Sequence, residues 1–120
     1  MTYDILVLDL DGTLTNSEKK ITPPTREALI EIQQNGKKVV LASGRPTPGI
    51  IPLAKELCLG DYGSYILSFN GGKIINCSTG EAIYNKILPS EVTSAVYEIA
   101  SQYDVDLLTY TEHRSEERRV

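Results

Sequence analysis

Short apolar runs alternate with amphipathic stretches in the first 72 residues. The runs Ile5–Leu8 and Val39–Ala42 have no polar alternation, which predicts strands covered on both faces, as in a parallel sheet between helices. Between them, Thr22-Pro23-Pro24-Thr25 predicts the start of a helix and Asn35-Gly36 its end. Strand, helix and strand in this order predict a right-handed crossover, so both strands are expected to end at the same edge of the sheet.

The alternation continues to Gly72 and then changes. A second helix is expected to begin near Thr47-Pro48, with Pro52 delaying its regular part, and a third core strand is expected over Tyr65–Phe69. The later pattern predicts a hairpin of two strands, a helix and one more strand, over 73–77, 82–86, 90–103 and 105–110. This order predicts a second structural unit beginning after Gly72.

Composition narrows the class of protein. The chain has 120 residues, of which 41% are hydrophobic and 23% charged, values that are ordinary for one globular domain. A net charge of −4 argues against a nucleic-acid partner bound through its phosphates. No apolar run approaches the roughly 20 residues that span a bilayer, so we expect a cytoplasmic protein with no membrane partner. Cys58 and Cys77 are expected to be small buried thiols, in neither a disulfide nor a zinc site.

Polar residues whose side chains could take part in binding or catalysis follow two of the predicted strands directly. Asp9 and Asp11 end the first strand, and Gly12 lets the backbone turn away there. Ser43-Gly44-Arg45 ends the second strand and offers a hydroxyl and a fixed positive charge. Ligands bind outside the carboxyl ends of such strands, so these groups are expected to form one phosphate-binding site.

Two carboxylates in one place suggest a reaction as well as a site. Their repulsion calls for a cation, and oxygen ligands of this kind suit Mg²⁺. A carboxylate can attack phosphorus to form an aspartyl-phosphate, and a second one can act as general acid and base. The alternative is that Asp11-Gly12 is only a turn signal, which the neighbouring Ser43-Gly44-Arg45 disfavours. Asn70 is equally consistent with a turn-former and a site residue.

These residues carry a resemblance to a known family. Asp9-Leu10-Asp11-Gly12-Thr13-Leu14 resembles the first motif of the haloacid dehalogenase (HAD) superfamily, and Leu41–Arg45 resembles its second. Ser68–Gly72 and the hairpin after it resemble the Cof-type branch of sugar-phosphate phosphatases. The resemblance implies an α/β fold, with an incomplete Rossmann-like core in residues 1–72. It also implies the beginning of an α+β cap in 73–110, followed by a polar tail, 111–120, expected to be disordered.

The resemblance also implies roles for individual residues. Asp9 would be the nucleophile and a Mg²⁺ ligand, and Asp11 would be the general acid and base and bind the metal through its backbone carbonyl. Ser43 would donate a hydrogen bond to the transferring phosphoryl group. The residues implied in phosphate or substrate binding, some through backbone amides, are Leu10, Gly12, Ser43, Gly44, Arg45 and Asn70.

Two motifs of that family have no counterpart in this sequence. They supply a lysine and further acidic metal ligands, and neither Lys73, Lys86 nor the acidic residues of the tail fit their contexts. His113, in the tail, is expected to be solvated. We therefore expect the N-terminal part of a longer enzyme, ended by a truncation or a shift of reading frame, and the sequence leaves its activity as a fragment open.

The expected function is that of a Mg²⁺-dependent phosphatase. It would hydrolyse the phosphate monoester of a small metabolite such as a sugar phosphate, through an aspartyl-phosphate. One alternative is a non-catalytic module that binds phosphate, metal or a partner chain; another is a phosphotransferase or mutase of the same family. The sequence determines neither the substrate nor the oligomeric state.

Overall fold

A computed structural model describes residues 2–86, 88–110 and 115–119, with side chains described as far as residue 108. The chain divides into two compact units, residues 1–85 and 86–120. No helix among the described residues is long and apolar enough to cross a membrane.

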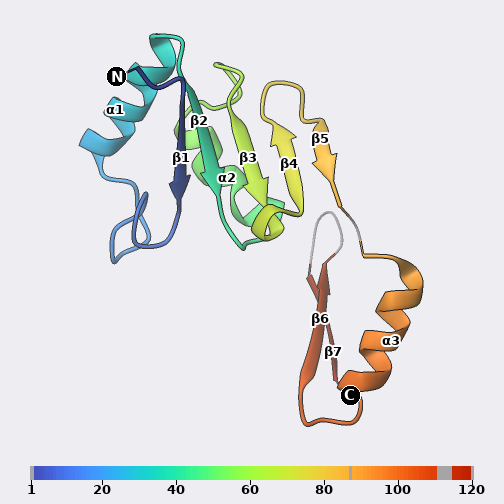
Figure 1. Cartoon of the computed structure of the whole chain (residues 1–120). Helices are drawn as coiled ribbons and strands as arrows, with labels where there is room; N and C mark the ends of the chain where they lie inside the picture. Colours follow the sequence, from blue (N-terminus) through green and yellow to red (C-terminus); the bar gives the residue numbers. More distant parts are fainter. Residues whose placement is uncertain (1, 87, 111–114, 120) are drawn as a thin grey trace. The chain divides into compact units, whose positions relative to one another are not determined.

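The first unit is built on one five-stranded sheet. Its strands follow the order β1-β2-β3-β4-β5, in which β1, β2 and β3 are parallel and β4 and β5 are antiparallel (Figure 1). The elements are β1 (Ile5–Asp9), α1 (Pro23–Gln34), β2 (Lys38–Ala42), α2 (Ile51–Glu56), β3 (Tyr65–Ser68), β4 (Lys73–Asn76) and β5 (Ala82–Asn85). The expected α/β class and the parallel pairing of the first two strands are confirmed.

The core lies against one face of this sheet. Val39 and Leu41 alternate along β2, and Ile66 of β3 is in register with Leu41, so the three side chains share a face. Leu29 of α1 and Ala54 of α2 join the same buried cluster. Both helices therefore cover this face. This is expected because the connections from β1 to β2 and from β2 to β3 are both right-handed and proceed in the same direction across the sheet.

The opposite face is less covered, which corrects the expectation that β1 is buried on both faces. Ile5 and Val7 lie on the face away from the core and are 57% and 58% exposed. Leu6, on the core side, is still 40% exposed. The physical reason is the place of β1, which ends the sheet and pairs only with β2 among the described strands.

The hairpin after Gly72 belongs to the same sheet. β4 pairs with β3 from Tyr65↔Asn76 to Ser68↔Lys73, and β5 pairs with β4. The compact unit ends at residue 85, whereas the sequence pattern places a boundary after Gly72. A tight turn explains the difference, because Phe69, Asn70 and Gly71 all have positive φ and reverse the chain directly onto β3.

A buried polar network joins the start of β2 to α1. Gln33 is only 3% exposed and donates from Nε2 to the carbonyls of Leu29 (3.1 Å) and Leu57 (2.9 Å). Its Oε1 accepts a 2.8 Å hydrogen bond from Ser64 Oγ, which in turn accepts 3.0 Å from the amide of Val39.

The second unit contains α3 (Ser90–Ala100), β6 (Asp106–Tyr110) and β7 (Ser115–Arg119). The helix and the strand after it were both expected, with bounds that differ by a few residues. β7 pairs antiparallel with β6. The expectation of a wholly disordered tail is therefore wrong for residues 115–119, because β6 offers them a strand edge. His113 lies outside the described residues.

Candidate functional site

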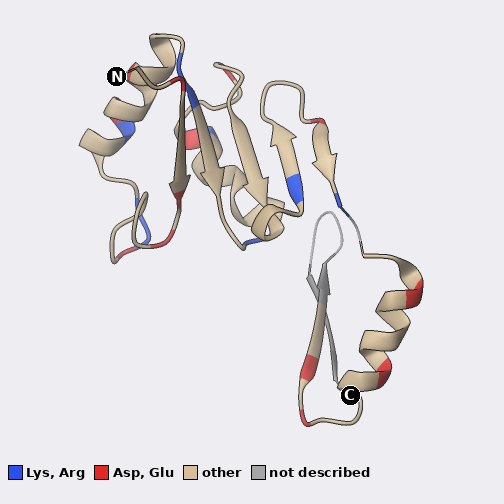
Figure 2. Ribbon diagram, in the orientation of Figure 1, with Lys and Arg blue, Asp and Glu red and all other residues tan. Residues whose placement is uncertain are grey.

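The carboxyl ends of β1, β2 and β3 lie at one edge of the sheet, as expected. Asp9 is in register with Ala42, and Ala42 with Leu67, so the segments that follow these strands start side by side. The three arrows point the same way in Figure 1. Along β1, β2 and β3, the charged positions lie near the strand ends, and the central parts of these strands carry none (Figure 2).

The loop after β1 is anchored by its apolar residues and by its own backbone. Leu10 and Leu14 are buried, so between them the exposed Asp11 and Gly12 turn outward. The amides of Leu14 and Thr15 donate to the carbonyls of Asp9 (3.1 Å) and Leu10 (3.0 Å). Gly12 has φ +80°, which an L residue adopts only at a cost, so glycine is required there by the backbone. The side chain of Leu10 belongs to the core, which leaves only its backbone for a ligand.

The loop after β2 is fixed to the loop after β3 by three backbone hydrogen bonds. The amide of Ser43 donates to Leu67 O (3.0 Å), that of Asn70 to Ser43 O (3.0 Å), and that of Phe69 to Arg45 O (2.9 Å). Asn70 thus touches the site at least through its backbone, in a left-handed conformation with φ 55°. A β-carbon at Gly44 would meet nothing within 4 Å, so space is open beside Ser43.

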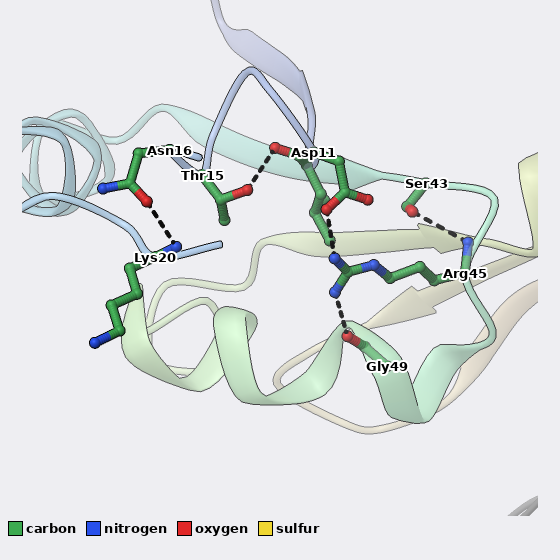
Figure 3. A network of polar contacts seen from close by, with 8 residues as sticks. Asp11, Thr15, Asn16, Lys20, Ser43, Arg45 and Gly49 are labelled. Carbon is green, nitrogen blue, oxygen red and sulfur yellow. Dashed lines mark hydrogen bonds and ion pairs between the residues drawn. The ribbon is translucent and has the colours of Figure 1, made fainter. Parts of the chain in front are cut away.

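Arg45 connects the two loops that carry the charged groups. Its Nη2 donates a 2.6 Å hydrogen bond to Asp11 Oδ1, and its Nη1 donates to Gly49 O at 3.2 Å. Figure 3 shows the guanidinium held between these two acceptors. The side chains remain partly solvated, with 31% of Arg45 and 58% of Asp11 exposed. The Ser43 hydroxyl accepts from the Arg45 amide at 3.1 Å, which leaves its own proton available as a donor.

Two residues that support Arg45 were not found by sequence reasoning. Thr47 and Ser68 are both buried, and their hydroxyl oxygens lie 2.7 Å apart. This contact ties the 3₁₀ turn Thr47–Gly49, which supplies the Arg45 acceptor, to the end of β3. The sequence shows a hydroxyl at the start of the turn after β2 and another at the end of β3, but it does not reveal that these two hydroxyls meet.

The donor set fits part of a magnesium site. Asp9 and Asp11 are exposed carboxylates two residues apart, and Mg²⁺ is commonly held by one or two carboxylates together with phosphate oxygens and water. Among the described residues there is no group of three or more acidic, histidine or cysteine side chains that could hold a metal ion. The described part of the chain therefore offers two carboxylate ligands for such a site, those of Asp9 and Asp11.

The two thiols lie apart from this chemistry. Cys58 and Cys77 are free and only half-buried, which corrects the expectation of full burial. Burial raises the pKa of the Cys77 thiol to about 11. A thiol in this state is a weak nucleophile near neutral pH, in agreement with a packing role.

Parallel strands whose carboxyl ends carry two aspartates, a serine and an arginine place these groups where open α/β proteins bind their ligands. Residues 6–115 match the family model described as haloacid dehalogenase-like hydrolase, and the chain belongs to that family.

Similar proteins agree with this assignment. A haloacid dehalogenase-like hydrolase from Bacteroides thetaiotaomicron is 53% identical, with a TM-score of 0.84 over 91% of this chain and 41% of that one. YxeH of Bacillus subtilis, provisionally named a phosphatase, is 33% identical over 88% of this chain and 37% of its own. The subclass IIB sugar phosphatase BT4131 is 26% identical, with a TM-score of 0.73 over 96% and 44%. The chain thus spans less than half of each of these relatives and corresponds to their N-terminal part.

Proposed function

We propose that this chain carries the nucleophile and acid/base half of a Mg²⁺-dependent phosphatase that hydrolyses a phosphate monoester of a small metabolite. The observation that carries the proposal is the contact of Arg45 with Asp11, which joins the acidic loop after β1 to the hydroxyl and guanidinium after β2. A sugar phosphate is the substrate class we favour, because one similar structure is named a sugar phosphatase.

In the proposed reaction, an oxygen of Asp9 attacks the phosphorus atom and the bond to the leaving oxygen breaks. Asp11 acts as the general acid and gives a proton to the leaving oxygen. Water then attacks the phosphorus of the aspartyl-phosphate and gives a proton to Asp11, while the bond between phosphorus and the Asp9 oxygen breaks. Inorganic phosphate leaves, and both carboxyl groups return to their starting state. Mg²⁺, held by Asp9 and by Asp11 through its carbonyl, would neutralise negative charge on the phosphoryl oxygens.

The chain's other groups have binding tasks. The Ser43 hydroxyl accepts from the Arg45 amide through one lone pair, and its own proton would be donated to a phosphoryl oxygen. Arg45 holds the Asp11 side chain through their 2.6 Å contact and would add positive charge beside the bound phosphate. The open space at Gly44 lets the substrate approach the backbone.

The test measures Mg²⁺-dependent release of phosphate from p-nitrophenyl phosphate by the chain, by Asp9→Asn and by Asp61→Asn, an exposed aspartate elsewhere. We expect Asp9→Asn to lose at least a hundredfold in rate and Asp61→Asn to keep it. Acetyl phosphate labelling with mass spectrometry should place one phosphoryl group on Asp9. Equal rates in the wild type and Asp9→Asn, with no labelled Asp9, would contradict the proposal.

A further inference from the structure

The side chain of Arg45 takes its direction from the short turn that follows it. Its Nη1 donates to Gly49 O at 3.2 Å, and its Nη2 donates to Asp11 Oδ1 at 2.6 Å. A β-carbon built on Gly49 would lie 3.6 Å from both Cβ and Cδ of Arg45, so the aliphatic part of this side chain runs alongside the turn. A displacement of the turn would therefore move the guanidinium relative to Asp11 (Figure 3).

This turn is too short to fix its own position. Thr47–Gly49 is a single 3₁₀ turn of three residues. Its backbone hydrogen bonds run from the amide of Gly49 to Pro46 O and from that of Ile50 to Thr47 O, both at 3.0 Å, so they stay within the turn and its direct neighbours. Short 3₁₀ turns also have poor hydrogen-bond geometry. Contacts with other elements must therefore set where the turn lies.

Side-chain contacts at both ends of the turn anchor it in the first unit. Ile50, which follows the turn, is fully buried in the core. Thr47, at its start, is buried as well, and its hydroxyl oxygen lies 2.7 Å from that of Ser68, which is fully buried at the end of β3. A hydrophobic contact has no preferred direction, whereas a hydrogen bond constrains both distance and angle. The hydroxyl pair therefore constrains the turn against β3 more tightly than the contacts of Ile50 do.

The residues directly after Ser68 extend the same connection to the start of the loop. The amide of Phe69 donates to Arg45 O (2.9 Å), and that of Asn70 donates to Ser43 O (3.0 Å). These bonds hold the backbone on the strand side of the Arg45 side chain, and the hydroxyl pair holds the turn on its other side. The guanidinium thus lies in a loop that the end of β3 fixes from both directions.

The separation of the two hydroxyl oxygens is shorter than an apolar contact allows. They lie 2.7 Å apart, whereas carbon atoms in contact are about 3.5–4.0 Å apart. A methyl group in place of the Thr47 hydroxyl would therefore push the turn away from β3 by on the order of 1 Å. A misplacement of this size is enough to impair a binding or catalytic site, even when it begins away from the reacting groups.

We infer that Thr47 and Ser68 are positioning residues of the phosphate site. Through their hydroxyl pair they hold the turn after β2 in the place where Arg45 meets both Gly49 O and Asp11. Both residues are buried, and they act through Arg45 rather than by touching the ligand. The inference rests on the proposed function in one respect, that Arg45 serves a bound phosphate.

The test measures the affinity of the chain for inorganic phosphate with Mg²⁺ by calorimetry. Thr47→Val, which keeps the shape of threonine, should lower this affinity roughly three- to tenfold, and Thr47→Ser, which keeps the hydroxyl, should retain it. Ser64→Ala is the matched control, because it removes a fully buried hydroxyl that belongs to the network of Gln33. It should lower stability and leave the phosphate affinity unchanged. Equal affinities of Thr47→Val and Thr47→Ser, or an equal loss in Ser64→Ala, would overturn the inference.

A double-mutant cycle shows whether the effect passes through Arg45. In an Arg45→Gln background, Thr47→Val should change the phosphate affinity by less than about twofold, while its effect on urea denaturation should remain. An undiminished loss of affinity in that background would overturn the inference, because the hydroxyl would then act by another route. If circular dichroism shows that Thr47→Val does not fold, Ser68→Ala takes its place, since it removes the other hydroxyl without adding volume.

The position of the Arg45 side chain is also measured without a ligand. The guanidinium nitrogen signals of Arg45 in NMR spectra should shift or broaden in Thr47→Val and stay unchanged in Thr47→Ser and Ser64→Ala. If the wild-type chain binds no phosphate, the proposed function fails and these signals alone decide the inference. A chain that binds phosphate but gives the same Arg45 signals in the wild type and in Thr47→Val would keep the function and overturn the inference.

Discussion

Arg45 Nη2 lies 2.6 Å from Asp11 Oδ1, although 34 residues separate them in the sequence. The contact brings a fixed positive charge to one of the two carboxylates at the end of β1. Its geometry depends on a second acceptor, Gly49 O, which holds Nη1 of the same guanidinium. A lysine could not serve both acceptors in this fork geometry.

Arg45→Gln should therefore affect ligand binding far more than stability. The pair is solvated, and exposed ion pairs contribute about 0–1 kcal/mol to the free energy of unfolding. We expect urea denaturation to change within that range, while the affinity for inorganic phosphate, measured by calorimetry with Mg²⁺, falls about tenfold. Arg26→Gln, on the exposed side of α1, is the control. Unchanged phosphate affinity in Arg45→Gln would remove Arg45 from the binding site.

Gly12→Ala should destabilise the chain, and Gly44→Ala should not. A β-carbon has open space at both positions, so only the backbone distinguishes them. Gly12 has φ +80°, and an L residue there costs about 1–2 kcal/mol. Urea midpoints of the two variants provide the comparison. Equal stability would mean that the loop after β1 can relax out of the left-handed conformation.

Ser64→Ala should be among the most destabilising small substitutions in the first unit. It leaves the amide of Val39 and Oε1 of Gln33 without their buried partner, at a cost of about 1–3 kcal/mol for each unsatisfied group. Ser17→Ala, at an exposed loop position, should change the free energy of unfolding by less than about 0.5 kcal/mol. A loss below 1 kcal/mol in Ser64→Ala would indicate that water replaces the hydroxyl.

Cys77 should resist alkylation at mild pH. Its pKa is raised by burial from 9.0 to about 11, and only the thiolate reacts. In a Cys58→Ser background, the alkylation rate at pH 8 should be roughly a hundredfold below that of a thiol with pKa 9.0. It should rise until the pH reaches about 11. A plateau near pH 9 would contradict this prediction.

The same shift has a consequence for stability. Because the folded pKa is raised, the native state holds the proton more tightly than the unfolded chain. The contribution of Cys77 is fully present below pH 9 and is lost as the pH rises toward 11. Cys77→Ala should remove this part of the pH dependence in urea denaturation measured between pH 8 and 11.

Local sequence patterns were sufficient to predict the order of strands and helices and the edge at which the candidate site lies. Apolar runs such as Ile5–Leu8 and turn signals such as Asn35-Gly36 act locally, and handedness fixes where consecutive parallel strands end. A compact motif in the sequence also predicts Asp9 and Asp11 as site residues. These features are local in the chain, so local patterns can predict them.

Local sequence patterns could not predict which distant groups meet and which apolar faces are covered, because both depend on the packing of the folded chain. Three contacts depend on how loops pack across the sheet: Arg45 with Asp11, Thr47 with Ser68, and the buried pair of Gln33 and Ser64. The extension of the sheet by β4 follows from a turn with three consecutive positive φ values. Most of all, the apolar pattern of β1 predicts burial on both faces, but the burial of a strand depends on which other elements pack against it. The described chain supplies those neighbours on one edge alone.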